Sequence, residues 1–132
     1  SDWYLGGVVS YDEAVKERLL GVPAATLAAH GAVSRETARA MAAGALRLLD
    51  AAVAVAVTGL AGPGGGTPQT PVGTVFVAWA WPGGERQERL SLSGDRAAVK
   101  EQAARAALRG LLAAVRAAPL SALTPEPSPE PS

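Results

Sequence analysis

A glycine- and proline-rich stretch lies between two segments that have the composition of β-strands. Residues 58–74 read TGLAGPGGGTPQTPVGT, with six glycines and three prolines, and they separate AAVAVAVT (51–58) from GTVFVAWAW (73–81). Two antiparallel strands need only about two to five residues to connect them. A connection this long is typical either of a ligand-binding loop or of an elaborate crossover between strands, and composition alone does not separate the two.

Apolar periodicity predicts the other elements of the chain. The continuous apolar run 51–58 is typical of a central strand buried on both faces. Short β-branched or alternating segments predict further strands at 6–11, 73–81 and 86–93, the last pairing antiparallel after the turn Pro82-Gly83-Gly84. Helical spacing predicts four helices. The first is 12–20, with Asp12 available as its N-cap, and the second is 23–30, with Pro23 as its first residue. The third is 35–49, capped by Ser34, and the last runs from Ser93 or Asp95 to about Ala118.

The order of these elements predicts an α/β layered domain with a mixed sheet. The chain enters its first predicted strand a few residues after Ser1, so we expect the βα unit that would normally introduce such a sheet to be missing. From Pro119 the sequence is rich in proline, glutamate and serine. Residues 119–132 are therefore predicted to be a disordered tail, and residues 1–118 a single domain.

Composition argues against several classes of function. Lysine plus arginine and aspartate plus glutamate both number 12, and no basic stripe stands out, which disfavours a nucleic-acid binder. Without cysteine and with His30 as the single histidine, we expect no disulfide, no metal site and no cofactor. No apolar run is long enough to span a membrane and no leader opens the chain, so a cytoplasmic protein is expected.

The glycine-rich stretch does not match the familiar phosphate-binding motifs. A P-loop requires Lys followed by Ser or Thr after its last glycine, whereas Gly66 is followed by Thr67-Pro68. The dinucleotide pattern GxGxxG also fails, and a strand rather than a helix follows. What remains is a constrained loop at the end of a strand, where open α/β sheets bind ligands.

Two other clusters have a functional and a structural interpretation. Ser93–Arg96 (SGDR) could bind an anion at the start of a helix, but an ordinary helix cap is the simpler interpretation. Lys16 and Lys100 are the only lysines among the 12 basic residues, and lysine, unlike arginine, can lose its proton. Lys16 could serve as a general base near Ser10 and Tyr11, but from the residues alone a surface ion pair with Asp12 is the favoured interpretation.

Four segments in the right order resemble the C-terminal domain of the CinA family, which also occurs alone as nicotinamide mononucleotide deamidase. They are GGVVSYDEAVKERLLGV, HGAVSRETARAMAAGA, TGLAGPGGGTPQTPVGTV and LSGDRAAVK, and the similarity covers roughly residues 1–115. The third segment is the most specific of them.

The resemblance implies a three-layer α/β/α fold and, commonly, a homodimer. It also implies hydrolysis of the carboxamide of nicotinamide mononucleotide to nicotinate mononucleotide and ammonia. It implies Ser1 as the nucleophile, Lys16 as the base and Tyr11 as the residue that relays the proton. Loop backbone N–H groups would hold the ribose phosphate or the developing oxyanion, and Arg96 would bind the phosphate or the nicotinamide end. The substrate-binding residues implied in this way are Thr58, Gly59, Gly62, Pro63, Gly64, Gly65 and Arg96.

The chain departs from the family pattern at its start. Family domains have several dozen more residues in front, including a Ser-Cys-Thr-Gly-Gly segment that lines the same pocket. This departure keeps a second hypothesis open, a nucleotide-binding or protein-interaction module without catalytic activity. The two hypotheses differ in whether Lys16 is needed for turnover.

Overall fold

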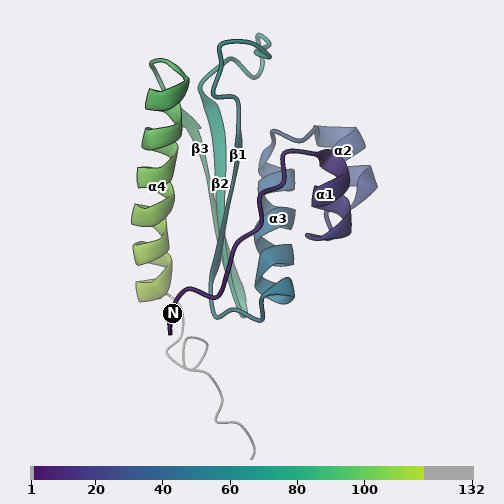
Figure 1. Cartoon of the computed structure of the whole chain (residues 1–132), viewed down its shortest axis with the longest axis vertical. Coiled ribbons are helices and arrows are strands. Elements are labelled where there is room, and N and C mark those ends of the chain that lie inside the picture. Colours follow the sequence, from purple (N-terminus) through teal and green to yellow (C-terminus); the bar gives the residue numbers. More distant parts are fainter. Residues whose placement is uncertain (1, 118–132) are drawn as a thin grey trace, which may run out of the picture.

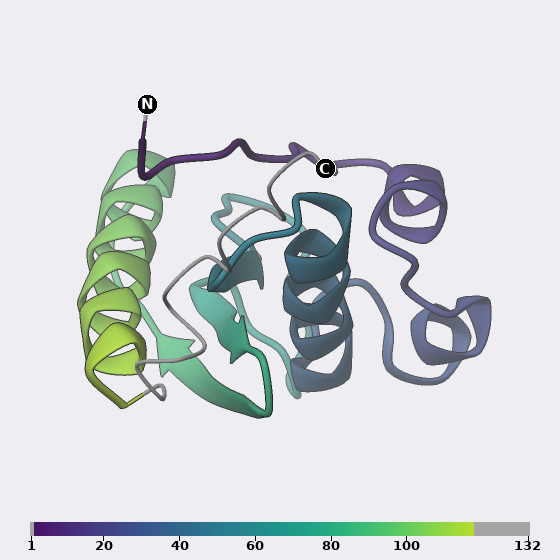
Figure 2. The same cartoon turned by 90° about the horizontal axis from the view of Figure 1, so that it is seen from below.

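The computed structural model describes residues 2–117, which form three layers (Figure 1). A three-stranded sheet lies in the middle, with helix α4 on one face and helix α3 on the other, and the two short helices α1 and α2 lie outside α3 (Figures 1 and 2). The elements are α1 (Glu13–Arg18), α2 (Ala24–His30), α3 (Arg35–Leu48), β1 (Ala54–Gly59), β2 (Thr74–Trp81), β3 (Gly84–Ser91) and α4 (Arg96–Ala117). The predicted α/β/α layering is confirmed.

The alternation of side chains along β2 divides the core into two halves. Phe76 and Ala78 point toward α3, while Val75, Val77 and Trp79 point toward α4. Trp79 is fully buried, and its Nε1 donates a hydrogen bond to the carbonyl oxygen of Ala107 in α4 at 3.0 Å. Since successive side chains of a strand point to opposite faces, one apolar strand supplies both cores.

Polar caps begin three of the helices where the sequence predicts them. The side chains of Asp12, Ser34 and Asp95 accept hydrogen bonds from backbone N–H groups of the first turns of α1, α3 and α4. Pro23 lies at the N-cap of α2 rather than at its first helical position, a difference of one residue. The hairpin of β2 and β3 is also confirmed, with Val77 opposite Glu88.

The prediction of a mixed sheet was wrong. Both strand pairs are antiparallel, in the order β1-β2-β3, within the residues that the structure describes. A parallel pairing would have needed the predicted strand Gly6–Tyr11, but this segment forms no ladder. It crosses the open side of the molecule between α4 and α3 (Figure 2), and Val9 is exposed. Apolar β-branched residues favour a strand only where a neighbouring strand supplies hydrogen-bond partners.

The prediction that residues 51–58 form the central strand was also wrong. β1 lies at an edge of the described sheet, and its Val57 is 41% exposed. β2 is the central strand, buried along all but its last residue. A continuous apolar run shows that a strand can be buried, but it does not say how many neighbours the strand has. The predicted tail, 119–132, lies outside the described residues.

Candidate active site

A cavity of about 210 Å³ opens between the sheet and the first turns of α4, where β1 enters the glycine-rich loop. β1, β2, α4 and the residue before the cap of α1 contribute to it. The lining residues are Tyr11, Val57, Gly59, Ala61, Val75, Arg96, Val99, Lys100 and Ala103.

Regular periodicity explains why these residues meet. β1 and β2 send every second residue toward α4, so Val57, Gly59 and Val75 form an apolar floor. The α4 residues that line the cavity lie at i, i+3, i+4 and i+7 from Arg96 and therefore share one face of the helix. Local structure thus aligns the residues within each element, and the packing of α4 on the sheet brings them together around the cavity.

Two cations and no acidic residue line the cavity. The Arg96 guanidinium donates one hydrogen bond, at 3.2 Å, to the carbonyl oxygen of Gly62 in the loop. The Lys100 side chain makes no hydrogen bond or ion pair with any residue of the described range 2–117. The cavity therefore combines an apolar floor with positive charge that no lining carboxylate neutralises.

Tyr11 brings a phenol group to the rim of this cavity. It is 81% exposed and lies directly before Asp12, the cap of α1. In sequence it is far from Arg96, yet the fold places both in the lining of one cavity. A predicted catalytic residue and a predicted substrate-binding residue therefore meet in the structure.

Lys16 is buried and does not line the cavity. Its side chain is 6% exposed, and its ammonium donates a hydrogen bond to the carbonyl oxygen of Ser10, the residue before Tyr11. The alternative interpretation of Lys16 as half of a surface ion pair with Asp12 is wrong, because the ammonium points into the protein. The lysine instead holds the backbone that carries Tyr11.

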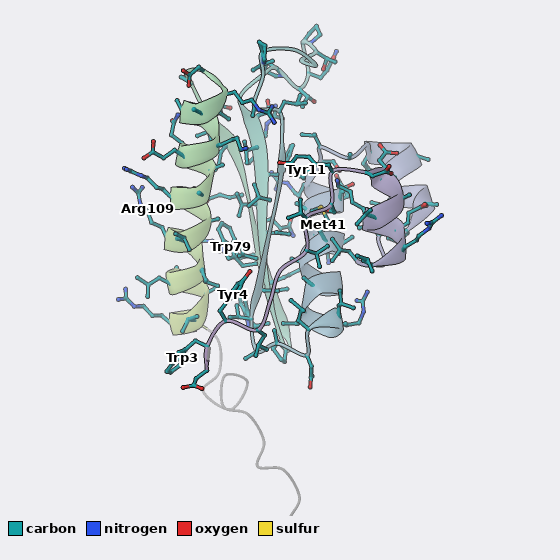
Figure 3. All side chains as sticks on the ribbon, in the orientation of Figure 1. Trp3, Tyr4, Tyr11, Met41, Trp79 and Arg109 are labelled. Carbon is teal, nitrogen blue, oxygen red and sulfur yellow. The ribbon has the colours of Figure 1, made fainter. Side chains whose placement is uncertain are left out.

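Ser1 lies outside the described residues. Its near neighbour Trp3 lies beside the C-terminal end of α4, at the opposite end of the N-terminal segment from Tyr11 (Figure 3). The structure therefore does not bring Trp3 to the cavity, and the role of Ser1 stays a prediction.

The glycine-rich loop contributes to the cavity through its beginning. Gly59 and Ala61 line the cavity. Gly62 does not line it, but its carbonyl oxygen accepts a hydrogen bond from Arg96, which does. Gly62 has a φ of +86°, a conformation that L side chains rarely adopt, and a cis peptide bond joins it to Pro63. Pro63, Gly64 and Gly65, which were also predicted to bind substrate, do not line the cavity.

Thr58 has a structural contact on the opposite face of the sheet. Its hydroxyl donates a hydrogen bond to the carbonyl oxygen of Ala32 at 2.7 Å, and its side chain is not among those lining the cavity. This contact ties the end of β1 to the turn between α2 and α3. A substrate contact from Thr58 would have to come from its backbone.

Lys100 is a charged residue of the cavity to which the sequence motifs gave no functional role. Its position on α4, one turn after Arg96, could have indicated a shared face, and lysine is rare in this chain. Nothing in the sequence shows that this face meets β1 and Tyr11. That information depends on how α4 packs on the sheet.

Within residues 2–117 no group of three or more histidine, aspartate or glutamate side chains is arranged as a metal site. The same residues contain no helix of the length and hydropathy needed to cross a bilayer.

Comparison with known proteins identifies the family of this layered α/β domain. The profile of the CinA C-terminal domain matches residues 1–115. A CinA-like protein from Anaeromyxobacter dehalogenans (strain 2CP-C) is 56% identical over 110 residues, which are 83% of this chain and 27% of that protein. The chain thus spans about a quarter of the length of the curated relative.

Solved structures agree with this match. The competence/damage-inducible protein CihA from Agrobacterium tumefaciens is 42% identical with a TM-score of 0.78, covering 80% of this chain and 65% of the solved one. The competence damage-inducible protein A of Klebsiella pneumoniae is 41% identical with a TM-score of 0.79, covering 83% and 68%. The chain belongs to the CinA C-terminal domain family.

Proposed function

We propose that this chain carries an amidohydrolase site that converts nicotinamide mononucleotide to nicotinate mononucleotide and ammonia. The observation that carries the proposal is the cavity itself. Tyr11 and Arg96, which the family resemblance assigns to the amidase site, line the same cavity although they lie far apart in the sequence. Membership of the CinA C-terminal domain family supports the same activity.

The cavity has the chemistry that such a substrate requires. The apolar floor suits the flat face of the pyridinium ring, and the two cations suit a phosphate group. Its volume of about 210 Å³ is below the roughly 300–1,000 Å³ of most small-molecule sites, so the described residues would hold part of the ligand.

In the proposed reaction a serine hydroxyl attacks the carboxamide carbon and loses its proton to a base, for which Lys16 is the candidate. The family resemblance indicates Ser1 as this serine; because Trp3 lies at the far end of the N-terminal segment from Tyr11, the reaction requires the start of the chain to reach the cavity. The C–N bond then breaks, and the nitrogen leaves as ammonia after taking up a proton through Tyr11. Water attacks the resulting ester, which releases the carboxylate and restores the serine. Tyr11 lines the cavity, which supports this role, while Lys16 would act from beneath the Ser10–Tyr11 backbone.

One observation favours a second candidate, a module that binds a nucleotide without hydrolysing it. Lys16 is hydrogen-bonded to Ser10 and does not line the cavity, so no described lysine from α1 reaches the substrate space directly. This candidate keeps the cavity and its cations but lacks the base.

Product analysis separates the two candidates. The chain is incubated with nicotinamide mononucleotide, and the products are identified by chromatography alongside an ammonia assay. The proposal predicts nicotinate mononucleotide and ammonia in equal amounts. Binding of the nucleotide without either product would favour the second candidate, and release of free nicotinamide would show a different reaction.

The homodimer expected from the family is part of the same proposal. Sedimentation velocity of the chain tests it, and a single species with the mass of one chain would contradict it.

A further inference from the structure

We propose that Lys100 is a specificity-determining residue of the cavity: with Arg96 it binds the phosphate of the ligand and selects nucleotides over nucleosides. This inference rests on the proposed function for the identity of the ligand, but its evidence is separate. It comes from the charges that line the cavity and from the partners of the neighbouring acids.

Lys100 and Arg96 belong to one wall of the cavity. They lie four residues apart on α4, and side chains at this spacing are neighbours on a helix surface. Two like charges held side by side repel each other, so the pair favours a ligand that is itself an anion.

The acidic residues closest in sequence are engaged elsewhere. The Asp95 carboxylate accepts a hydrogen bond from the backbone N–H of Ala98 at 2.9 Å, as the cap of α4. Glu101 forms an ion pair with Arg105 at 2.8 Å. Neither pairs with Lys100, so the ammonium keeps all of its donors for a ligand.

The two cations have different tasks. Arg96 shares its guanidinium with the Gly62 carbonyl and therefore couples an anion to the position of the glycine-rich loop. Lys100 has no such contact and supplies a mobile point charge. Removing Lys100 should therefore weaken phosphate binding without disturbing the loop.

The floor beneath these cations defines the rest of the ligand. Val57, Val75 and Val99 are apolar, and Tyr11 lies at the rim. An anionic group joined to a flat aromatic ring fits this combination, and both the phosphate of the substrate and the carboxylate of the product are anions. Arg96 contacts the loop at Gly62, and Lys100 lies one turn further along α4; we assign both cations to the phosphate.

The test measures binding rather than turnover. Isothermal titration gives the dissociation constants of nicotinamide mononucleotide, nicotinamide riboside and nicotinate riboside for the wild-type chain and for Lys100→Gln. We expect Lys100→Gln to raise the dissociation constant of the mononucleotide about ten-fold, because a charge-assisted hydrogen bond is lost. The dissociation constant of nicotinamide riboside should stay unchanged. Lys100→Arg should restore most of the affinity.

A matched control removes a charge from the same helix away from the cavity. Arg109 lies on α4, points away from the sheet (Figure 3) and does not line the cavity, so Arg109→Gln should leave all three constants unchanged. Both variants concern exposed side chains, and their melting temperatures should match the wild type.

Three results would overturn the assignment of Lys100. The first is that Lys100→Gln binds the mononucleotide with wild-type affinity, and the second is that it loses affinity equally for the mononucleotide and nicotinamide riboside. The third is a loss of affinity for nicotinate riboside alone, which would assign Lys100 to the carboxylate. Failure of the wild type to bind the mononucleotide would also overturn it. Ammonia release from the same samples is scored separately, so tight, Lys100-dependent binding without ammonia would contradict the proposed reaction alone.

Discussion

The Lys16 side chain carries its ammonium into the protein rather than to the surface. A buried amine is costly unless it has a hydrogen-bond partner, and here the Ser10 carbonyl provides one. Because Ser10 precedes Tyr11, the contact also determines where the phenol stands at the cavity. Lys16 therefore has a positioning role in the structure, and its role as a base is a separate prediction.

Lys16→Met tests whether this amine is needed for turnover. Methionine keeps a long apolar stem but lacks the amine, so we expect ammonia release to fall about 100-fold or more. Thermal unfolding followed by circular dichroism checks that the variant folds. A folded variant with the wild-type rate would refute both roles of Lys16 in the reaction.

At the scale of elements, the contact between α4 and β2 holds the cavity together. Gly110 of α4 lies directly against the ring of Trp79, and a Cβ at this position would overlap the ring. The Trp79 hydrogen bond to Ala107 is one turn away on the same helix. A glycine in the middle of a helix is here a packing requirement.

Gly110→Ala should therefore destabilise the protein. Although alanine favours a helix, overpacking a core of this kind costs about 1–3 kcal/mol, so we expect a net loss in the free energy of unfolding. Urea denaturation measures it. Gly64→Ala is the matched control, because nothing lies within 4 Å of the added Cβ, and it should change stability little. Equal stability of the two variants would contradict the packing described here.

At the scale of the whole molecule, local sequence signals predicted most of the helices and strands but not which strands lie side by side in the sheet. The caps Asp12, Ser34 and Asp95 and the turn at Gly83 are read from adjacent residues, and these predictions are confirmed. The edge position of β1 and the unpaired segment Gly6–Tyr11 depend on which strands lie alongside, which no local pattern encodes.

The candidate site shows the same division. The family motifs indicated Tyr11, Gly59 and Arg96, and all three line one cavity. The burial of Lys16 and the presence of Lys100 in the lining follow from how helices pack on the sheet. Sequence spacing within one helix predicts a shared face but not what that face meets.

The most direct test of the central claim is the rate of ammonia release from nicotinamide mononucleotide by the wild type and by Tyr11→Phe. Tyr4→Phe is the matched control, since Tyr4 is also exposed and is not among the residues lining the cavity. We predict ammonia release by the wild type and by Tyr4→Phe, and a loss of about 100-fold in Tyr11→Phe, whose phenol hydroxyl would relay the proton. No ammonia from the wild type, or equal rates in all three proteins, would contradict an amidohydrolase site at this cavity.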